Sequence, residues 1–302
     1  MDIREIWKNG CELCPRKCRA RRDEGKQGFC GARDTIRVAR AALHMWEEPC
    51  ISGSRGSGAV FFSGCGLRCC YCQNHEIALG KVGKEITMAR LADIFLELEQ
   101  KGAANINLVT GAHYVPQILE ALEAAQARGF SLPIVYNSSG YESVDTLKML
   151  EGAVDVYLPD FKYMDPELAK KYSGASDYPE AAKAAIREMV RQTGSCVFDE
   201  AGYIRKGTIV RHLILPGHTK NAIQVLKYLH GQFGGDIYIS IMNQYTPVCN
   251  LPQYPELGRK VTRREYEKVL DAALEMGIEN GFTQEGETAK ESFIPSFDYE
   301  GV

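Results

Sequence analysis

The stretch GCGLRCCYCQN, residues 64–74, decides how the rest of the chain is interpreted. Cys65, Cys69 and Cys72 stand in it with three and then two residues between them, directly after the apolar run at 59–62. A short glycine-bearing loop that leaves a strand can wrap several thiolates around an iron–sulfur cluster. Three cysteines on a four-iron cluster leave one iron open, as catalytic zinc sites leave one position open. The spacing therefore predicts such a cluster, with structural thiols or half of a zinc site as the alternative.

The composition is that of an ordinary globular enzyme. Of 302 residues, 45% are hydrophobic and 25% are charged, and the formal net charge is −3. No long basic run indicates a nucleic acid or an anionic membrane as a partner. Eleven cysteines without a signal peptide favour a reducing compartment, and no apolar run reaches the ~18 residues that a bilayer requires. We therefore expect a cytoplasmic protein.

A second set of cysteines, Cys11, Cys14, Cys18 and Cys30, lies near the N-terminus with two, three and eleven residues between them. The segment is too polar to build a core, so a metal that stabilises its fold is the simplest explanation. A second iron–sulfur cluster and a structural zinc both remain open, because ligand spacing alone separates the two poorly.

We predict three regions: a cysteine-rich segment and linker at 1–55, a main domain at 56–282 and a tail at 283–302. The linker has strand character at 35–39 and ends in a glycine–serine hinge at 52–58. In the main domain, strands alternate with helices that begin at capping residues such as Thr87 and Thr262. The expected strands are 59–63, 105–110, 133–137, 154–159, 208–215 and 236–242. This pattern predicts an α/β fold, a partial TIM barrel of six β/α units with a small N-terminal metal-binding segment.

Chemistry in such barrels lies at the carboxyl ends of the strands. Asn137 and Ser138 end one expected strand and suit ribose or carboxylate contacts. Asp160 and Lys162, two residues apart at the end of another, are expected to point the same way. His113 is either a site residue or an ordinary helix-entry histidine. The full set of expected cofactor contacts is Tyr71, Gly111, Asn137, Ser138, Asp160, Lys162, Arg211 and Met242.

The cysteine spacing, with Tyr71 before the last cysteine, resembles the signature of the radical S-adenosylmethionine (SAM) enzymes. Asp160-Phe161-Lys162 and the stretch from Arg211 to Gly217 resemble the branch around the pyruvate formate-lyase activating enzyme, in particular its uncharacterised relatives with an extra N-terminal cysteine motif. One departure is the stretch 110–113, Thr-Gly-Ala-His, where the family usually has a Gly-Gly-Glu contact to the SAM amino group.

The resemblance implies that Cys65, Cys69 and Cys72 hold a [4Fe–4S] cluster whose open iron binds SAM. An electron from reduced flavodoxin or ferredoxin would cleave SAM to methionine and a 5′-deoxyadenosyl radical. The radical would take hydrogen from a substrate. Tyr71 would line the adenine pocket, and Asp160, Lys162 and Arg211 would contact the cofactor.

Three functions remain open at this stage. The first is an activase of a glycyl-radical enzyme, and the second is a radical SAM enzyme acting on a small molecule, an amino acid or a peptide. The third is a non-catalytic iron–sulfur electron carrier, which usually gives its cluster four protein ligands. Cys70 would have to be the fourth ligand, although adjacent Cys69 and Cys70 can hardly both reach one cluster without strain.

Overall fold

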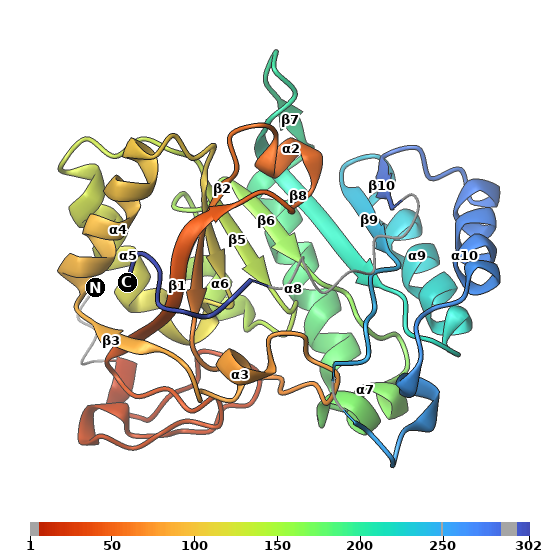
Figure 1. Ribbon diagram of the computed structural model, residues 1–302, viewed down its shortest axis with the longest axis horizontal. Coiled ribbons are helices and arrows are strands. Elements are labelled where there is room, and N and C mark those ends of the chain that lie inside the picture. The colour runs from red at the N-terminus through yellow and green to blue at the C-terminus, as the bar shows by residue number, and fades with distance from the viewer. Residues whose placement is uncertain (1–5, 249, 285–294) are drawn as a thin grey trace.

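A single sheet organises the protein, and the computed structural model describes residues 6–248, 250–284 and 295–302. The strand order is β10-β9-β8-β6-β5-β4-β2-β1-β3, with β7 paired to β8 beside this path. Every neighbouring pair from β2 to β10 is parallel. The helices that connect these strands lie along the sheet (Figure 1).

The six expected parallel strands are all present, and a short seventh, β10, follows them. They are β2 (Ser57–Phe62), β4 (Ile106–Val109), β5 (Ile134–Ser138), β6 (Val156–Pro159), β8 (Ile204–Leu213), β9 (Tyr238–Met242) and β10 (Gly281–Thr283). Strands β4 and β6 are fully buried along their length, which agrees with their near-continuous apolar sequences. The predicted α/β fold with a parallel barrel sheet is confirmed.

The helices begin where the capping residues predict. They are α2 (Pro49–Ser52), α3 (His75–Ala78), α4 (Met88–Gln100), α5 (Val115–Gln126), α6 (Val144–Met149), α7 (Pro166–Ser173), α8 (Tyr178–Thr193), α9 (Thr219–Phe233) and α10 (Arg263–Glu275). The Thr87 side chain accepts a hydrogen bond from the Arg90 backbone, and Thr262 forms the full capping box with Glu265. No helix in the described part of the chain is both long and apolar enough to cross a bilayer.

The stretch expected to be a linker is instead largely ordered sheet. Strand β1 (Ile36–His44) pairs antiparallel with β2 over residues 38–44, and β3 (Lys84–Ile86) pairs with its other edge. The expected hinge at 52–58 forms the end of α2 and the start of β2. Sequence reasoning underestimated β1 because its partners, β2 and β3, follow it at a distance in the chain.

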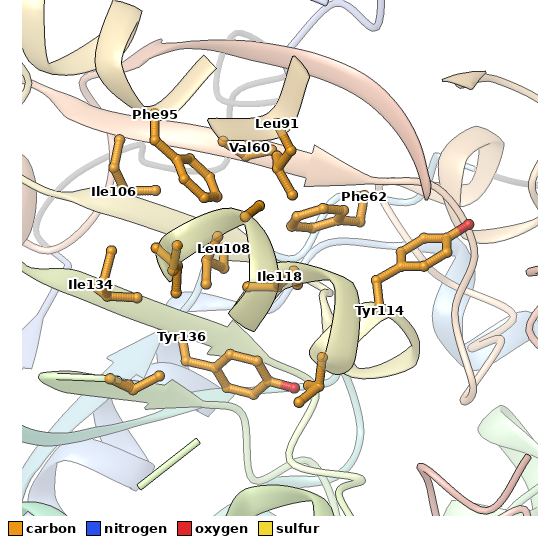
Figure 2. Close-up of a cluster of buried hydrophobic side chains, with 14 of the residues drawn as sticks. Val60, Phe62, Leu91, Phe95, Ile106, Leu108, Tyr114, Ile118, Ile134 and Tyr136 are labelled. Carbon is orange, nitrogen blue, oxygen red and sulfur yellow. The ribbon is translucent and has the colours of Figure 1, made fainter. Parts of the chain in front are cut away.

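The largest core lies between the sheet and helices α4 and α5. Figure 2 shows Val60, Leu108 and Tyr136 from the strands packed with Phe95 from α4 and Ile118 from α5. Burial of these side chains removes apolar surface from water, at roughly 25 cal/mol per Å². This packing fixes the strands, and with them the positions of the loops at their carboxyl ends.

The end of the tail is attached to β1. The Tyr299 N–H donates to Ala39 O at 3.2 Å, and the Ala41 N–H donates to Glu300 O at 2.8 Å. Phe297 packs edge-on against Phe61, with ring centroids 5.6 Å apart. The tail thus reaches the open side of the sheet, while residues 285–294 lie outside the described part.

Candidate active site

A cavity of about 230 Å³ lies at the carboxyl ends of the parallel strands, under the loop at 63–74. This end of the sheet is the one that carries α3 and α7 in Figure 1. Cys65, Cys69 and Cys72 line the cavity. Its polar lining residues include Glu47, Asn137, Asp160, Lys162, Arg211 and Gln244. Segments far apart in the sequence therefore meet at one site.

The loop that carries the cysteines is held in place at both ends. Gly64 begins it with a φ of 103°, and a Cβ at this position would lie 2.6 Å from the Cys30 carbonyl oxygen. Only glycine fits this close approach. The Ser173 hydroxyl at the end of α7 donates to Cys69 Sγ at 3.0 Å, and the Leu67 N–H approaches Cys65 Sγ at 3.4 Å. These contacts orient the two sulfur atoms.

Cys70 is set apart from the other three cysteines of the loop. Its backbone N–H donates to the Tyr172 carbonyl oxygen at 2.8 Å, and Cys70 is not among the residues that line the cavity. Three of the four loop cysteines thus face the cavity. This arrangement agrees with the three-ligand set that the sequence predicts.

These residues fit a four-iron cluster. Among the described residues, no three Cys, His, Asp or Glu side chains are grouped so that they could hold a metal ion. A single ion needs its ligands around one point, whereas each cysteine of a cluster binds its own iron, so the three sulfurs need only face a common space. Burial raises the pKa of Cys69 and Cys72, and the nearby Lys162 ammonium opposes this by stabilising the thiolates.

A network of charged side chains forms the wall of the cavity that faces β5, β6 and β8. Lys162 Nζ lies 2.5 Å from Asp160 Oδ2, and Arg211 Nε lies 3.0 Å from Asp160 Oδ1. The same guanidinium reaches Glu47 Oε2 at 3.2 Å and Asn137 Oδ1 at 2.6 Å. Two cations and two carboxylates therefore alternate along the wall.

The pKa values of this network reflect burial and pairing together. Burial by itself would raise the pKa of Asp160, yet Lys162 and Arg211 hold it below its ordinary value. Burial would lower the pKa of Lys162, but Asp160 and the cysteines hold it above its ordinary value. Both groups are thus charged near neutral pH. For Glu47 burial prevails and raises the pKa, although Arg211 opposes the shift.

A comparison with protein families decides the assignment of this site. The model of the radical SAM superfamily matches residues 59–229, more than half of the chain. The chain belongs to the radical SAM superfamily. It is therefore a radical SAM enzyme, and its family implies a [4Fe–4S] cluster and SAM as cofactors. The cysteine loop and the cavity both lie within or against the matched residues.

Individual radical SAM proteins resemble the chain more distantly. The uncharacterized protein MJ0674 of Methanocaldococcus jannaschii is 27% identical over 277 residues, which cover 89% of this chain and 75% of that protein. HydG, a maturase of the [FeFe]-hydrogenase, has a TM-score of 0.53 at 15% identity, over 82% of this chain and 56% of HydG. Streptococcus suis SuiB, bound to its precursor peptide SuiA, has a TM-score of 0.48 at 15% identity, over 74% of this chain and 47% of SuiB. The chain thus spans about half the length of these two solved proteins, and HydG shows the shared fold alone.

Most of the expected cofactor contacts come together in the radical SAM cavity. Those that line it are Tyr71, Asn137, Ser138, Asp160, Lys162, Arg211 and Met242. The Tyr71 hydroxyl bonds to Tyr163 at 2.6 Å, so its polar end is already paired within the protein. Gln244, a weaker expectation, lines the cavity as well. Their roles toward SAM remain predictions.

The stretch at 110–113 differs from the expectation. Gly111 does not line the cavity, and a Cβ there would meet Ile118 of α5 at 2.8 Å, so this glycine allows a close helix contact. Thr110 lines the cavity in its place, with a left-handed φ of 61°. His113 Nε2 bonds to Ser63 O at 2.9 Å, and burial, with Arg22 nearby, lowers its pKa to about 3. His113 is thus a neutral, buried residue that supports the start of the loop.

Sequence reasoning missed Glu47, which lies in the turn between β1 and α2. Its Oε1 accepts hydrogen bonds from Asn107 at 3.0 Å and Asn137 at 3.2 Å, and its Oε2 pairs with Arg211. The only signal in the sequence is an acidic pair, Glu47 and Glu48, between two apolar stretches. His44 and Trp46, from the same turn, also line the cavity.

The N-terminal cysteines lie against the cysteine loop, although the structure does not show them as a metal site. Cys11 and Cys30 are buried, and Cys18 is exposed. A Cβ on Gly28 would lie 3.4 Å from the sulfurs of both Cys18 and Cys30, so these two thiols are neighbours. A Cβ on Gly66 would lie 3.5 Å from Cys14 Sγ. Whether this set binds a second cluster or zinc stays a prediction.

Proposed function

We propose that the protein cleaves SAM reductively in this cavity and directs the resulting radical at a substrate, as in the branch around the pyruvate formate-lyase activating enzyme. The observation that carries the proposal is that three cysteines and the network of Asp160, Lys162 and Arg211 face one cavity. Cys65, Cys69 and Cys72 would hold the cluster. When bound, the cluster supplies one electron that breaks a carbon–sulfur bond of SAM.

The chain's own residues would bind and orient SAM. Lys162 has a single printed ion pair, to Asp160, so its ammonium group retains donors for the SAM carboxylate. Asn137 and Ser138 present an amide and a hydroxyl to the ribose. Arg211 is occupied by Asp160, Glu47 and Asn137, so it would position these residues for SAM.

The opening of the cavity supports a peptide or protein as the substrate. His44, Trp46 and Pro295 line its edge. Leu43, Met45 and Trp46 are 37%, 44% and 61% exposed, which places three large apolar side chains together at this edge. Clustered apolar exposure of this kind is typical of a surface that binds a polypeptide. It favours an activase that takes hydrogen from a partner protein, or an enzyme that acts on a peptide.

A small-molecule substrate remains the second candidate, because the cavity itself is modest in size. The non-catalytic electron carrier is the weakest, because Cys70 is turned toward Tyr172 and a carrier has no use for an open iron beside a polar cavity.

The direct test is formation of 5′-deoxyadenosine by the anaerobically reconstituted protein with SAM and dithionite. We expect product from the wild type and from Cys70→Ala, and none from Cys69→Ala. Equal product from the wild type and Cys69→Ala would contradict the ligand assignment. Absence of product from a wild-type protein with full iron and sulfide would favour the electron carrier.

A further inference from the structure

A basic surface lies directly outside the cysteine loop. Phe29 is 39% exposed, and the guanidinium groups of Arg16 and Arg68 lie 4.4 and 4.6 Å from the centre of its ring. Lys17 follows Arg16 and is exposed, as is Arg68. We call Phe29, Arg16, Lys17 and Arg68 the basic patch. An aromatic ring between two guanidinium groups is a compact surface of the kind found at protein interfaces.

The charge of the segment that carries the patch contrasts with the rest of the chain. Residues 11–33 contain seven Lys or Arg and three Asp or Glu, whereas the whole chain has a net charge of −3. Of the three acidic residues, Glu12 pairs with Arg19, and Asp23 and Glu24 pair with Arg21. The positive charges of Arg16, Lys17 and Arg68 are therefore not offset by these carboxylates. Such a surface attracts an acidic partner.

The backbone gives a second, independent reason to assign a function to the patch. Among the described residues, five that are not glycine have a left-handed φ, and Lys17, Arg19 and Arg68 are three of them, at 41°, 52° and 57°. Glycine or asparagine adopts this conformation at less cost. A side chain kept in a strained conformation is typical of a functional surface. Here the retained side chains are all basic.

The patch is connected to the cysteine loop itself. Arg16 Nε donates to Gly66 O at 2.9 Å, and Arg16 Nη1 donates to Gly174 O at 2.7 Å. Arg68 precedes Cys69 directly in the chain. A protein bound here would lie against the loop that holds the cluster. The substrate opening is formed by other segments, around Trp46 and Pro295, so the two partners would not compete.

We propose that the basic patch of Phe29, Arg16, Lys17 and Arg68 is the docking surface for a small acidic protein that delivers one electron to the cluster. This inference rests on the proposed function, which consumes one electron for each cleaved carbon–sulfur bond. The donor loses that electron, and the cluster passes it to SAM. The N-terminal segment, which the barrel itself does not need, thereby gains a role in recognition of the donor.

The test compares two electron sources in the same protein. The variant combines Lys17→Asn with Arg68→Asn, because asparagine tolerates the left-handed backbone and removes both charges. We expect the KM for a reduced acidic flavodoxin to rise about tenfold or more, while the rate of 5′-deoxyadenosine formation with dithionite stays the same. The matched control combines Lys220→Gln with Lys227→Gln, two exposed lysines of α9, and should leave both rates unchanged.

A binding measurement supplies a readout without turnover. Titration of oxidised flavodoxin with the reconstituted protein, followed by flavin fluorescence, should give a Kd that rises with salt in the wild type and rises similarly in the double variant. An unchanged Kd and KM in the variant would overturn the docking surface. An equal loss of the dithionite-driven rate would also overturn it, because the residues would then support the loop. Failure of the wild type with dithionite would instead count against the proposed function.

Discussion

Arg211 is the residue on which the charge balance of the cavity depends. It contacts two carboxylates, Asp160 and Glu47, and its side chain is 15% exposed. Without it, Asp160 would keep only Lys162, and Glu47 would keep only two amide donors. A buried carboxylate that loses its cation is costly, even where the intact pair adds little net stability.

Arg211→Met should therefore lower the free energy of unfolding by about 3–5 kcal/mol. Urea denaturation under anaerobic conditions measures the loss. The control is Arg263→Met, because Arg263 is 90% exposed in its pair with Glu267 and should change stability by less than about 1 kcal/mol. A similar small effect for both variants would contradict the account of the network.

Glu142 predicts a dependence of stability on pH. It is 3% exposed, and burial raises its pKa to about 8, although a hydrogen bond from Tyr136 opposes the shift. A carboxyl whose pKa is raised on folding contributes stability that is complete below its unfolded pKa and is lost as the pH rises through about 8.

Between pH 5 and pH 8 the wild type should therefore lose stability relative to Glu142→Gln, by up to about 1.4 kcal/mol per pH unit. Denaturation curves for both proteins across this range give the difference. A constant difference would show that Glu142 is ionised in the folded state.

At the scale of elements, the sequence predicted what local patterns determine. Buried strands such as β4 and β6 are continuous apolar runs, and α10 carries its capping box in the sequence, so both kinds of element were found. Strand β1 was only partly anticipated, because it pairs with β2, β3 and residue 299–300 of the tail. Glu47 was missed for the same reason, since only the turn after β1 brings it to Asn107, Asn137 and Arg211.

The cysteine loop makes a prediction about glycine. Gly64→Ala would place a Cβ 2.6 Å from the Cys30 carbonyl oxygen, at a φ of 103°. Gly102→Ala has a similarly left-handed φ of 84° but meets no atom within 4 Å. Both should cost on the order of 1–3 kcal/mol from backbone strain, but only Gly64→Ala should also lose iron after reconstitution. Equal iron content in the two variants would mean that the loop does not depend on this close contact.

For the whole molecule, two segments outside the matched family region complete the site from opposite sides. The N-terminal segment packs against the cysteine loop through Arg16 and the Cys30–Gly64 contact. The turn after β1 and the end of the tail border the substrate opening through Trp46 and Pro295. The electron donor and the substrate thus have separate routes to one cavity.

Metal analysis of a variant without Cys65, Cys69 and Cys72 tests the N-terminal cysteines. We expect this variant to retain metal, because Cys11, Cys14, Cys18 and Cys30 are untouched. Iron with sulfide would assign a second cluster, and zinc without iron would assign a structural zinc. A folded variant without either metal would contradict both predictions.

The central claim is that the cluster on Cys65, Cys69 and Cys72 has an open iron that SAM binds within the cavity. The most direct measurement is the electron paramagnetic resonance spectrum of the reduced cluster, recorded with and without SAM. Binding of SAM to one iron should change the g-values in the wild type, and the change should weaken in Lys162→Ala, which loses the proposed carboxylate contact. Identical spectra with and without SAM in a fully loaded wild-type protein would contradict the claim.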